Sequence, residues 1–221
     1  MKERLTRKVC CALCGTSSLQ TLFCSLPSEG PSDLDSRPPE WDRSVLPHLV
    51  QRCHHCGYTA PDITKGEERL FEIWKSGAPL LQQAPAKLPE EALAFLRWSA
   101  LAEKAGKLVD AAWGVLWGAW ICDDHNLEGQ QRELRKRAFQ LFLPLWERRV
   151  PFGPDRETER LLLIDLLRRC RRFAEARAAS MIGLETIEKE PWRALFLFEA
   201  HLCENNDDGP HTFEEALEGP A

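Results

Sequence analysis

The sequence predicts a mainly α-helical protein with a small N-terminal module of short strands. Two observations support this fold class. Two Cys-x-x-Cys-Gly motifs, Cys11–Gly15 and Cys53–Gly57, lie within the first sixty residues, and proline, glycine and serine are frequent between them. From about residue 90 onward, apolar residues recur at helical spacing. The expected division is a module over residues 1–62, a packed linker over 63–89 and a helical domain over 90–221.

The composition is that of a globular protein with a core of its own. The chain has 221 residues, 43% of them hydrophobic, and a formal net charge of −5. Residues 1–60 hold seven Lys/Arg and six Asp/Glu, so neither part of the chain has the basic excess typical of nucleic-acid binding. A nucleic-acid partner is therefore not expected.

The N-terminal eight residues are charged and have no apolar run behind them, which predicts a cytoplasmic protein without a secretory signal. The longest apolar run, Ala111–Cys122, is shorter than the roughly 20 residues of a membrane-spanning helix. We expect it to be a buried helix and expect no contact with a membrane.

The two cysteine pairs predict one metal site. A Cys-x-x-Cys turn directs two thiolates to one point, and the glycine after it lets backbone N–H groups approach the sulfurs. The 38 residues between Cys14 and Cys53 are no obstacle, because loop closure costs grow only logarithmically with length. The predicted ligands of a structural Zn²⁺ are Cys11, Cys14, Cys53 and Cys56. Iron, as in rubredoxin-like electron carriers, is the alternative metal.

Three other side chains near these motifs carry atoms that can bind a metal, but none of them is expected to be a ligand. Cys10 precedes Cys11 but lacks the pair spacing, so it is interpreted as a spare thiol. His54 and His55 lie inside the second motif and are expected to be exposed turn residues, because four sulfurs complete a tetrahedron. A site with four protein ligands has no open position, so we expect no catalysis by the metal.

Short strands and a structured loop are expected around the cysteines. Alternating polar and apolar residues predict strands over Ser18–Cys24 and Val45–Arg52. Between them, Asp33, Asp35 and Arg37 lie in a loop that extends to Trp41. These charges either cap turns and form an internal ion pair or line a recognition surface beside the metal site.

Three segments together carry a resemblance to a known family. They are the first Cys-x-x-Cys-Gly motif, the run from Asp33 to Glu40 (Asp-Leu-Asp-Ser-Arg-Pro-Pro-Glu), and the run from Val50 to Asp62 around the second motif. With these, the chain resembles the bacterial family catalogued as domain of unknown function number 2225. The resemblance implies N-terminal cysteine pairs, as in zinc ribbons, followed by tetratricopeptide-like helices over most of the chain, and it implies no activity. The chain departs from the family at His54, where proline is expected.

The helical part begins with a short helix over Glu67–Lys75, in which Leu70, Phe71 and Trp74 recur at helical spacing. A second helix is expected to start at Pro89 and to bury Leu93, Leu96, Ala100 and Leu101, and a break at Gly106 leads into Leu108–Cys122. A long helix is predicted over Leu127–Arg149.

Three segments share a spacing typical of the second helix of a tetratricopeptide repeat. A large apolar residue stands three positions before an alanine, and in the first two copies a glycine follows seven residues later. The first two copies are 65 residues apart, which is not one standard period, so the expected array is irregular. The pairs are Leu108 and Ala111, Phe173 and Ala176, and Phe213 and Ala216, and the glycines are Gly118 and Gly183.

Several clusters in the helical part have two interpretations. Trp113, Trp117 and Trp120 share one helical face, which either packs on a neighbouring helix or forms a partner groove or homodimer surface. The arginines around Cys170 are either a solvated helix end or a surface for an acidic peptide. This cluster consists of Arg168, Arg169, Arg171 and Arg172. A second basic cluster is expected to form a solvated face and consists of Arg132, Arg135, Lys136 and Arg137. The remaining cysteines are expected to pack in the core, namely Cys24, Cys122, Cys170 and Cys203.

The expected function is binding without catalysis. The sequence has no phosphate-binding glycine loop, no His-Glu-x-x-His motif and no nucleophile elbow. We therefore expect a non-enzymatic scaffold or adaptor that binds a protein or peptide. Two other functions stay open: a rubredoxin-like redox protein, and a nucleic-acid-associated zinc ribbon that uses Arg4, Arg7, Lys8, Arg43 and Arg52.

Overall fold

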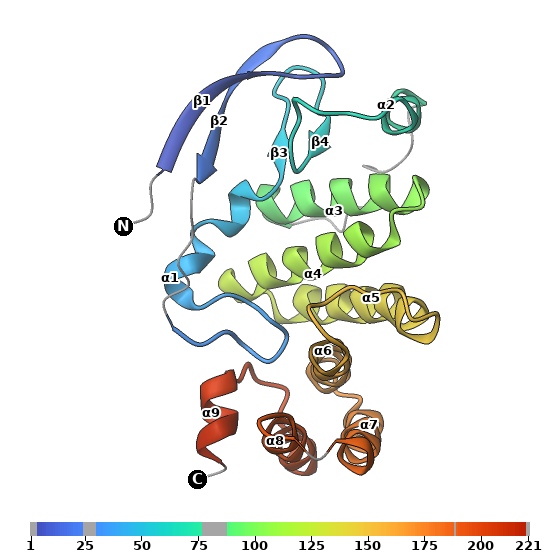
Figure 1. Cartoon of the computed structure of the whole chain (residues 1–221). Coiled ribbons are helices and arrows are strands. Elements are labelled where there is room, and N and C mark those ends of the chain that lie inside the picture. The colour runs from blue at the N-terminus through green and yellow to red at the C-terminus, as the bar shows by residue number, and fades with distance from the viewer. Residues whose placement is uncertain (1–3, 24–29, 77–87, 188, 220–221) are drawn as a thin grey trace. The chain divides into compact units, whose positions relative to one another are not determined.

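The computed structural model describes residues 4–23, 30–76, 88–187 and 189–219. It is mainly helical with a short-stranded N-terminal part, which confirms the predicted fold class (Figure 1). The chain forms two compact units: residues 1–28 with 42–131, and residues 29–41 with 132–221. These units differ from the predicted domains, because residues 29–41 belong with the C-terminal helices and residues 90–131 belong with the cysteine motifs.

The first unit carries both cysteine motifs in antiparallel hairpins. The first motif connects β1 to β2, which pair from Arg4 opposite Phe23 to Cys10 opposite Ser17. The second motif connects β3 to β4, which pair over two residues each. The bounds are β1 Arg4–Cys10, β2 Ser17–Phe23, β3 Gln51–Arg52 and β4 Thr59–Ala60.

The predicted strand over Val45–Arg52 is wrong for most of its length. Its first part is the 3-10 helix η1, Leu46–His48, which follows the short helix α1, Glu40–Arg43. Pro47 lacks a backbone N–H and has a fixed φ, which suits the first turn of a helix better than a sheet ladder. Only Gln51 and Arg52 are in strand conformation.

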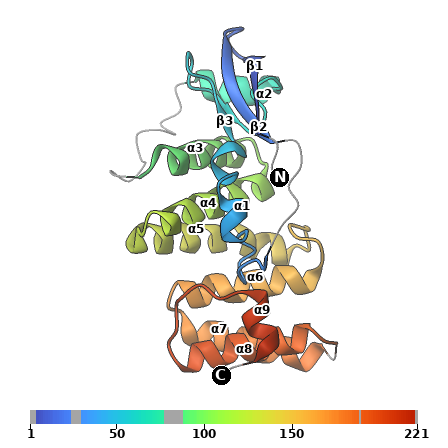
Figure 2. The same cartoon turned by 90° about the vertical axis from the view of Figure 1, so that its left-hand side faces the viewer.

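Three helices complete the first unit, and α3 and α4 run side by side in both views (Figure 2). The hydroxyl of Ser99 on α3 donates to the carbonyl of Ala111 on α4 at 2.7 Å, so the two helices approach closely. The buried face of α3 is offset from the predicted stripe: Leu101 is buried, but Leu93 and Leu96 are only partly so. The helices are α2 Glu68–Lys75, α3 Glu90–Lys104 and α4 Leu108–Asp124; α3 buries Ala92, Phe95, Trp98, Ser99, Leu101 and Ala102.

The tryptophan face of α4 packs within the first unit. Trp120 is buried, Trp117 contacts Phe95 of α3 edge to face at 5.6 Å, and Trp113 lies against both other tryptophans. This agrees with the packing interpretation, since edge-to-face ring pairs stabilise such a contact. The homodimer interpretation of this face stays a prediction.

The second unit contains most of α5, Glu128–Glu147, and the helices that follow it. Gly183 of α7 lies against Phe196 of α8, and a Cβ atom at Gly183 would come within 2.9 Å of that ring. The absence of a side chain at Gly183 therefore lets α7 and α8 approach closely at this position. The helices are α5 Glu128–Glu147, α6 Arg156–Arg169, α7 Phe173–Thr186, α8 Trp192–Glu204 and α9 Phe213–Glu218.

Helix termini in this unit follow the local sequence. The Asp155 carboxylate accepts from the Thr158 N–H at 2.7 Å at the start of α6. Thr212 and Glu215 form a reciprocal capping box at the start of α9. These caps explain why the two helices begin where they do.

The loop from Asp33 is part of the core of the second unit, so the recognition-surface interpretation is wrong for Asp35 and Arg37. Asp35 and Arg135 of α5 form an ion pair in which both side chains are 0% exposed. Arg37 is buried and lies 3.6 Å from Asp33. The backbone of Leu34 also donates to the carbonyl of His211 at 2.8 Å. The internal ion-pair interpretation is therefore confirmed; the side chain of Trp41 lies outside the described residues.

The arginine clusters are solvated only in part: Lys136 and Arg137 are exposed as predicted, but other members are buried. Arg168 is fully buried and donates to Glu199 at 2.8 Å and to Asp165. Arg169 is buried as well, and Arg171 pairs with Asp208. Arg135 is buried against Asp35. Both interpretations of the Cys170 cluster, a solvated helix end and an open surface for an acidic peptide, are therefore wrong for Arg168 and Arg169.

The buried carboxyl pair around Arg168 predicts a pH dependence. One oxygen of Asp165 and one of Glu199 meet no donor among the described residues, so we infer that one carboxyl keeps a proton. Burial, with Asp165 facing it, raises the pKa of Glu199 from 4.5 to about 8. Between these values the folded chain binds more protons than the unfolded one, so the free energy of unfolding should fall as pH rises, by up to about 1.4 kcal/mol per pH unit.

Glu199→Gln removes this titration and keeps an oxygen for Arg168 and an N–H for Asp165. Urea unfolding midpoints of the variant between pH 5 and 9 should therefore be flatter than those of the unchanged chain. Glu204→Gln, an exposed position on the same helix, is the control. Parallel profiles for the unchanged chain and Glu199→Gln would contradict the shared proton.

Candidate metal centre

The two cysteine motifs adopt the same backbone geometry. In each, the glycine after the second cysteine has a positive φ, 71° at Gly15 and 74° at Gly57, and its N–H donates to the carbonyl of the first cysteine. The N–H of the first cysteine in turn donates to the carbonyl of the residue five positions later, Thr16 or Tyr58, at 3.0 and 2.8 Å. A side chain at either glycine would be strained, which explains why both motifs end in glycine.

The four thiols form one cluster in the first unit. All four sulfurs lie within 4.8 Å of one another. The Sγ atoms of Cys11 and Cys56 are 3.8 Å apart, and those of Cys14 and Cys53 are 3.6 Å apart. Four sulfurs at the usual zinc–sulfur distance of about 2.3 Å are about 3.8 Å from each other in a tetrahedron. The donor set therefore fits a tetrahedrally bound metal ion.

The thiols differ in acidity because their surroundings differ. The hydroxyl and N–H of Thr16 lower the pKa of Cys14 to about 5. Burial, with the neighbouring thiols, raises the pKa of Cys56 to about 12, and burial raises the pKa of Cys11 as well. Four adjacent thiolates repel one another, and a divalent cation at their centre offsets that repulsion. The cluster thus has the electrostatics of a cation site.

The neighbouring side chains with ligand atoms stay outside the cluster. Cys10 is exposed and its thiol donates to the carbonyl of Gly15 at 3.2 Å. His54 and His55 are exposed turn residues, as predicted. Among the distant cysteines, Cys122 and Cys203 are buried and Cys170 is partly buried, which agrees with packing roles; Cys24 lies outside the described residues.

Tyr58, which the sequence reasoning did not single out, is a further residue of this site. It follows the second motif, is 0% exposed, and contacts the rings of Phe71 and Trp74 edge to face at 5.4 and 5.8 Å. Burial, with nearby Cys11 and Glu67, raises its pKa to about 12, and its hydroxyl has no hydrogen-bond partner among the described residues. Its position two residues after Cys56 was the only signal in the sequence.

Comparison with known proteins does not assign the chain to a family. No family model, no curated protein and no solved structure matches this chain. The resemblance to domain of unknown function number 2225 therefore stays a prediction. In the part of the chain that the structure describes, no helix has the length and apolarity needed to cross a bilayer.

Proposed function

We propose that the protein is a non-enzymatic scaffold that binds a protein or peptide and whose first unit is held together by a structural Zn²⁺. The observation that carries the metal is the cluster of four sulfurs on two matching turns. Thiolate ligands in a tetrahedron favour zinc or iron over magnesium or calcium. Since all four positions are taken by protein sulfur, such an ion supplies no site for a substrate.

The binding role is supported by the sequence, which has none of the catalytic motifs named above. The nucleic-acid alternative loses support, because Arg52 pairs with Glu90 and Arg43 lies 3.8 Å from Asp124. Both pairs are partly exposed, so they reduce the positive charge that a phosphate would meet but do not fix the two side chains. A cytoplasmic, reducing compartment would keep the four thiols available for the metal.

Elemental analysis of the purified full chain tests the metal. We expect close to one zinc per chain and a colourless protein. A red protein with one iron would support the rubredoxin-like alternative. Fewer than about 0.2 equivalents of either metal, after purification without chelators, would contradict the proposed centre.

Selection of a random peptide display library on the zinc-loaded chain tests the binding role. Enrichment of related peptides that bind in solution is the expected result. The same selection on chain treated with a chelator is the control, since loss of the metal should abolish binding that depends on the first unit. Failure to enrich any related peptides would argue against the scaffold role.

A further inference from the structure

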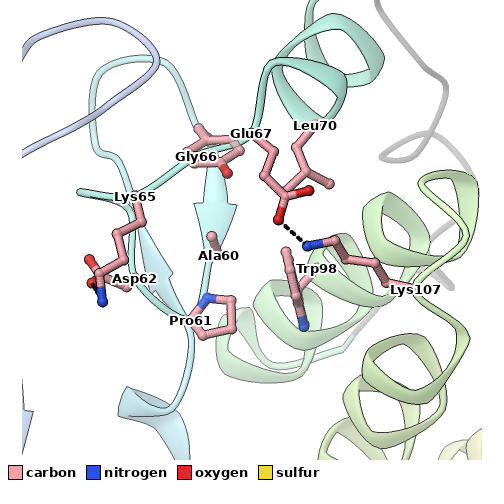
Figure 3. A pocket seen from close by; sticks show the side chains of 10 residues that line it. Ala60, Pro61, Asp62, Lys65, Gly66, Glu67, Leu70, Trp98 and Lys107 are labelled. Atoms are coloured by element: carbon pink, nitrogen blue, oxygen red, sulfur yellow. Dashed lines mark hydrogen bonds and ion pairs between the residues drawn. The ribbon is translucent and has the colours of Figure 1, made fainter.

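A pocket lies beside the metal centre, within the first unit. Its volume is about 220 Å³, below the roughly 300–1,000 Å³ typical of pockets for whole small molecules, so it suits a single side chain. Apolar groups form its walls: Ala60 and Pro61 after the second cysteine motif, Leu70 of α2 and Trp98 of α3 (Figure 3). Such walls suit an aliphatic stem.

Two ion pairs lie at the rim of the pocket. Glu67 pairs with Lys107, and Figure 3 shows the two side chains reaching toward each other next to Trp98. Asp62 lies 3.3 Å from Lys65 and also accepts from the hydroxyl and N–H of Thr64. Asp62 is therefore committed to its own loop, and Glu67 is the carboxylate able to change partner.

The pair between Glu67 and Lys107 is weak enough to exchange. The Glu67 side chain is 61% exposed and that of Lys107 is 32% exposed. Exposed ion pairs contribute only about 0–1 kcal/mol because water solvates both charges. A cation that arrives in the pocket can replace Lys107 at little cost.

Tyr58 also lines the pocket, and its buried hydroxyl lacks a partner among the described residues. A donor that enters the pocket would give the phenolic oxygen the hydrogen bond that the free protein leaves unmade. Trp98 lines the pocket as well, and indole rings are the side chains that bind cations best through their π faces. The two carboxylates and two ammonium groups at the rim cancel in charge. The nearby metal centre would not be neutral, because four thiolates around one Zn²⁺ carry a net charge of −2, and its ligand Cys56 is only two positions before Tyr58. The local field therefore favours a cation over an anion.

We propose that this pocket binds the lysine or arginine side chain of the peptide partner, with the stem against Leu70 and Trp98 and the charge at Glu67. The inference rests on the proposed scaffold function and names the chemistry that the scaffold selects. Lys107 occupies the place of the incoming cation in the free protein, so it acts as a competitor.

Blocked single amino acids test the pocket in the zinc-loaded full chain, by NMR titration of the Trp98 indole N–H. The probes are Nα-acetyl-lysine methylamide and Nα-acetyl-arginine methylamide, whose side chains stay charged. N-acetyl-norleucine methylamide, which keeps the stem without the charge, and the glutamate analogue are the comparators. We expect saturable shifts with the two cations only. Equal binding of norleucine, or tighter binding of glutamate, would overturn the proposal.

Lys107→Ala gives the sharpest test because a cation site and an anion site predict opposite signs. Removal of the competing ammonium should tighten binding of the cationic probes about two- to fivefold, whereas an anion site would lose affinity. Glu67→Gln should weaken the cationic probes by about fivefold or more. The controls are Lys104→Ala and Glu68→Gln, exposed neighbours that do not line the pocket.

Tyr58→Phe separates binding from stability. Loss of a buried hydroxyl without a partner should leave the unfolding midpoint unchanged or raised, while affinity for the cations falls about tenfold. Unchanged affinity for the cationic probes would show that the Tyr58 hydroxyl takes no part in binding them. If display selection enriches related peptides without basic residues, this inference fails while the scaffold function stands; if no related peptides are enriched, the scaffold function itself fails.

Discussion

Serine in place of Cys53 is expected to abolish metal binding and to unfold the strands of the first unit. Cys53 is buried, and its sulfur lies 3.6 Å from that of Cys14. Structural zinc contributes roughly 10 kcal/mol or more in small peptides, whereas a two-stranded hairpin is marginal by itself. We therefore expect the short pair β3 and β4 to depend strongly on the metal.

The loss should be local. The helices from α3 onward pack through their own apolar faces, so far-UV circular dichroism should keep most of its helical signal. Limited proteolysis of the variant should cut within residues 4–23 or 51–60 and leave residues 30–41 and the C-terminal helices intact. Treatment of the unchanged chain with a strong chelator should give the same pattern.

Cys10→Ser is the matched control, because Cys10 adjoins a proposed ligand but is exposed and outside the cluster. This variant should keep its metal and its protease resistance. Loss of metal from Cys10→Ser with retention in Cys53→Ser would show that the four sulfurs have been assigned wrongly.

The metal cluster was predictable because its information is local. Each Cys-x-x-Cys-Gly turn specifies its own geometry, and two such turns need only be brought together. Gly15 and Gly57 have a positive φ, which is the backbone conformation that explains the glycine in each motif. The same holds for Asp155 and Thr212, whose side chains cap the helices that follow them.

The burial of the arginines in ion pairs was not predictable, because their partners are distant in sequence. Arg135 meets Asp35, which lies 100 residues earlier, and Arg168 meets Glu199, which lies 31 residues later. A run of arginines on a helix is usually solvated, and only tertiary packing shows which members are buried. The offset of the buried face of α3 has the same origin, since its neighbours decide which face is covered.

Alanine in place of Asp35 is expected to have the largest effect in the second unit. Asp35 accepts from Nε and Nη2 of Arg135 at 3.1 and 2.8 Å, and neither side chain is exposed. Removal of the carboxylate leaves a buried guanidinium without its main counter-charge. Breaking a buried pair in this way typically costs about 3–5 kcal/mol, to be measured by urea unfolding followed at the C-terminal helices.

Two further variants separate the charge from the packing. Glu40→Ala, an exposed acid in the same loop region, should change the free energy of unfolding by less than about 0.5 kcal/mol. Asp35→Leu with Arg135→Met replaces both charges by apolar groups and should recover much of the loss, since buried ion pairs are often replaceable in this way. A double variant as unstable as Asp35→Ala would mean that the pair holds the loop from Asp33 through specific hydrogen bonds, because charge alone would then not account for the loss.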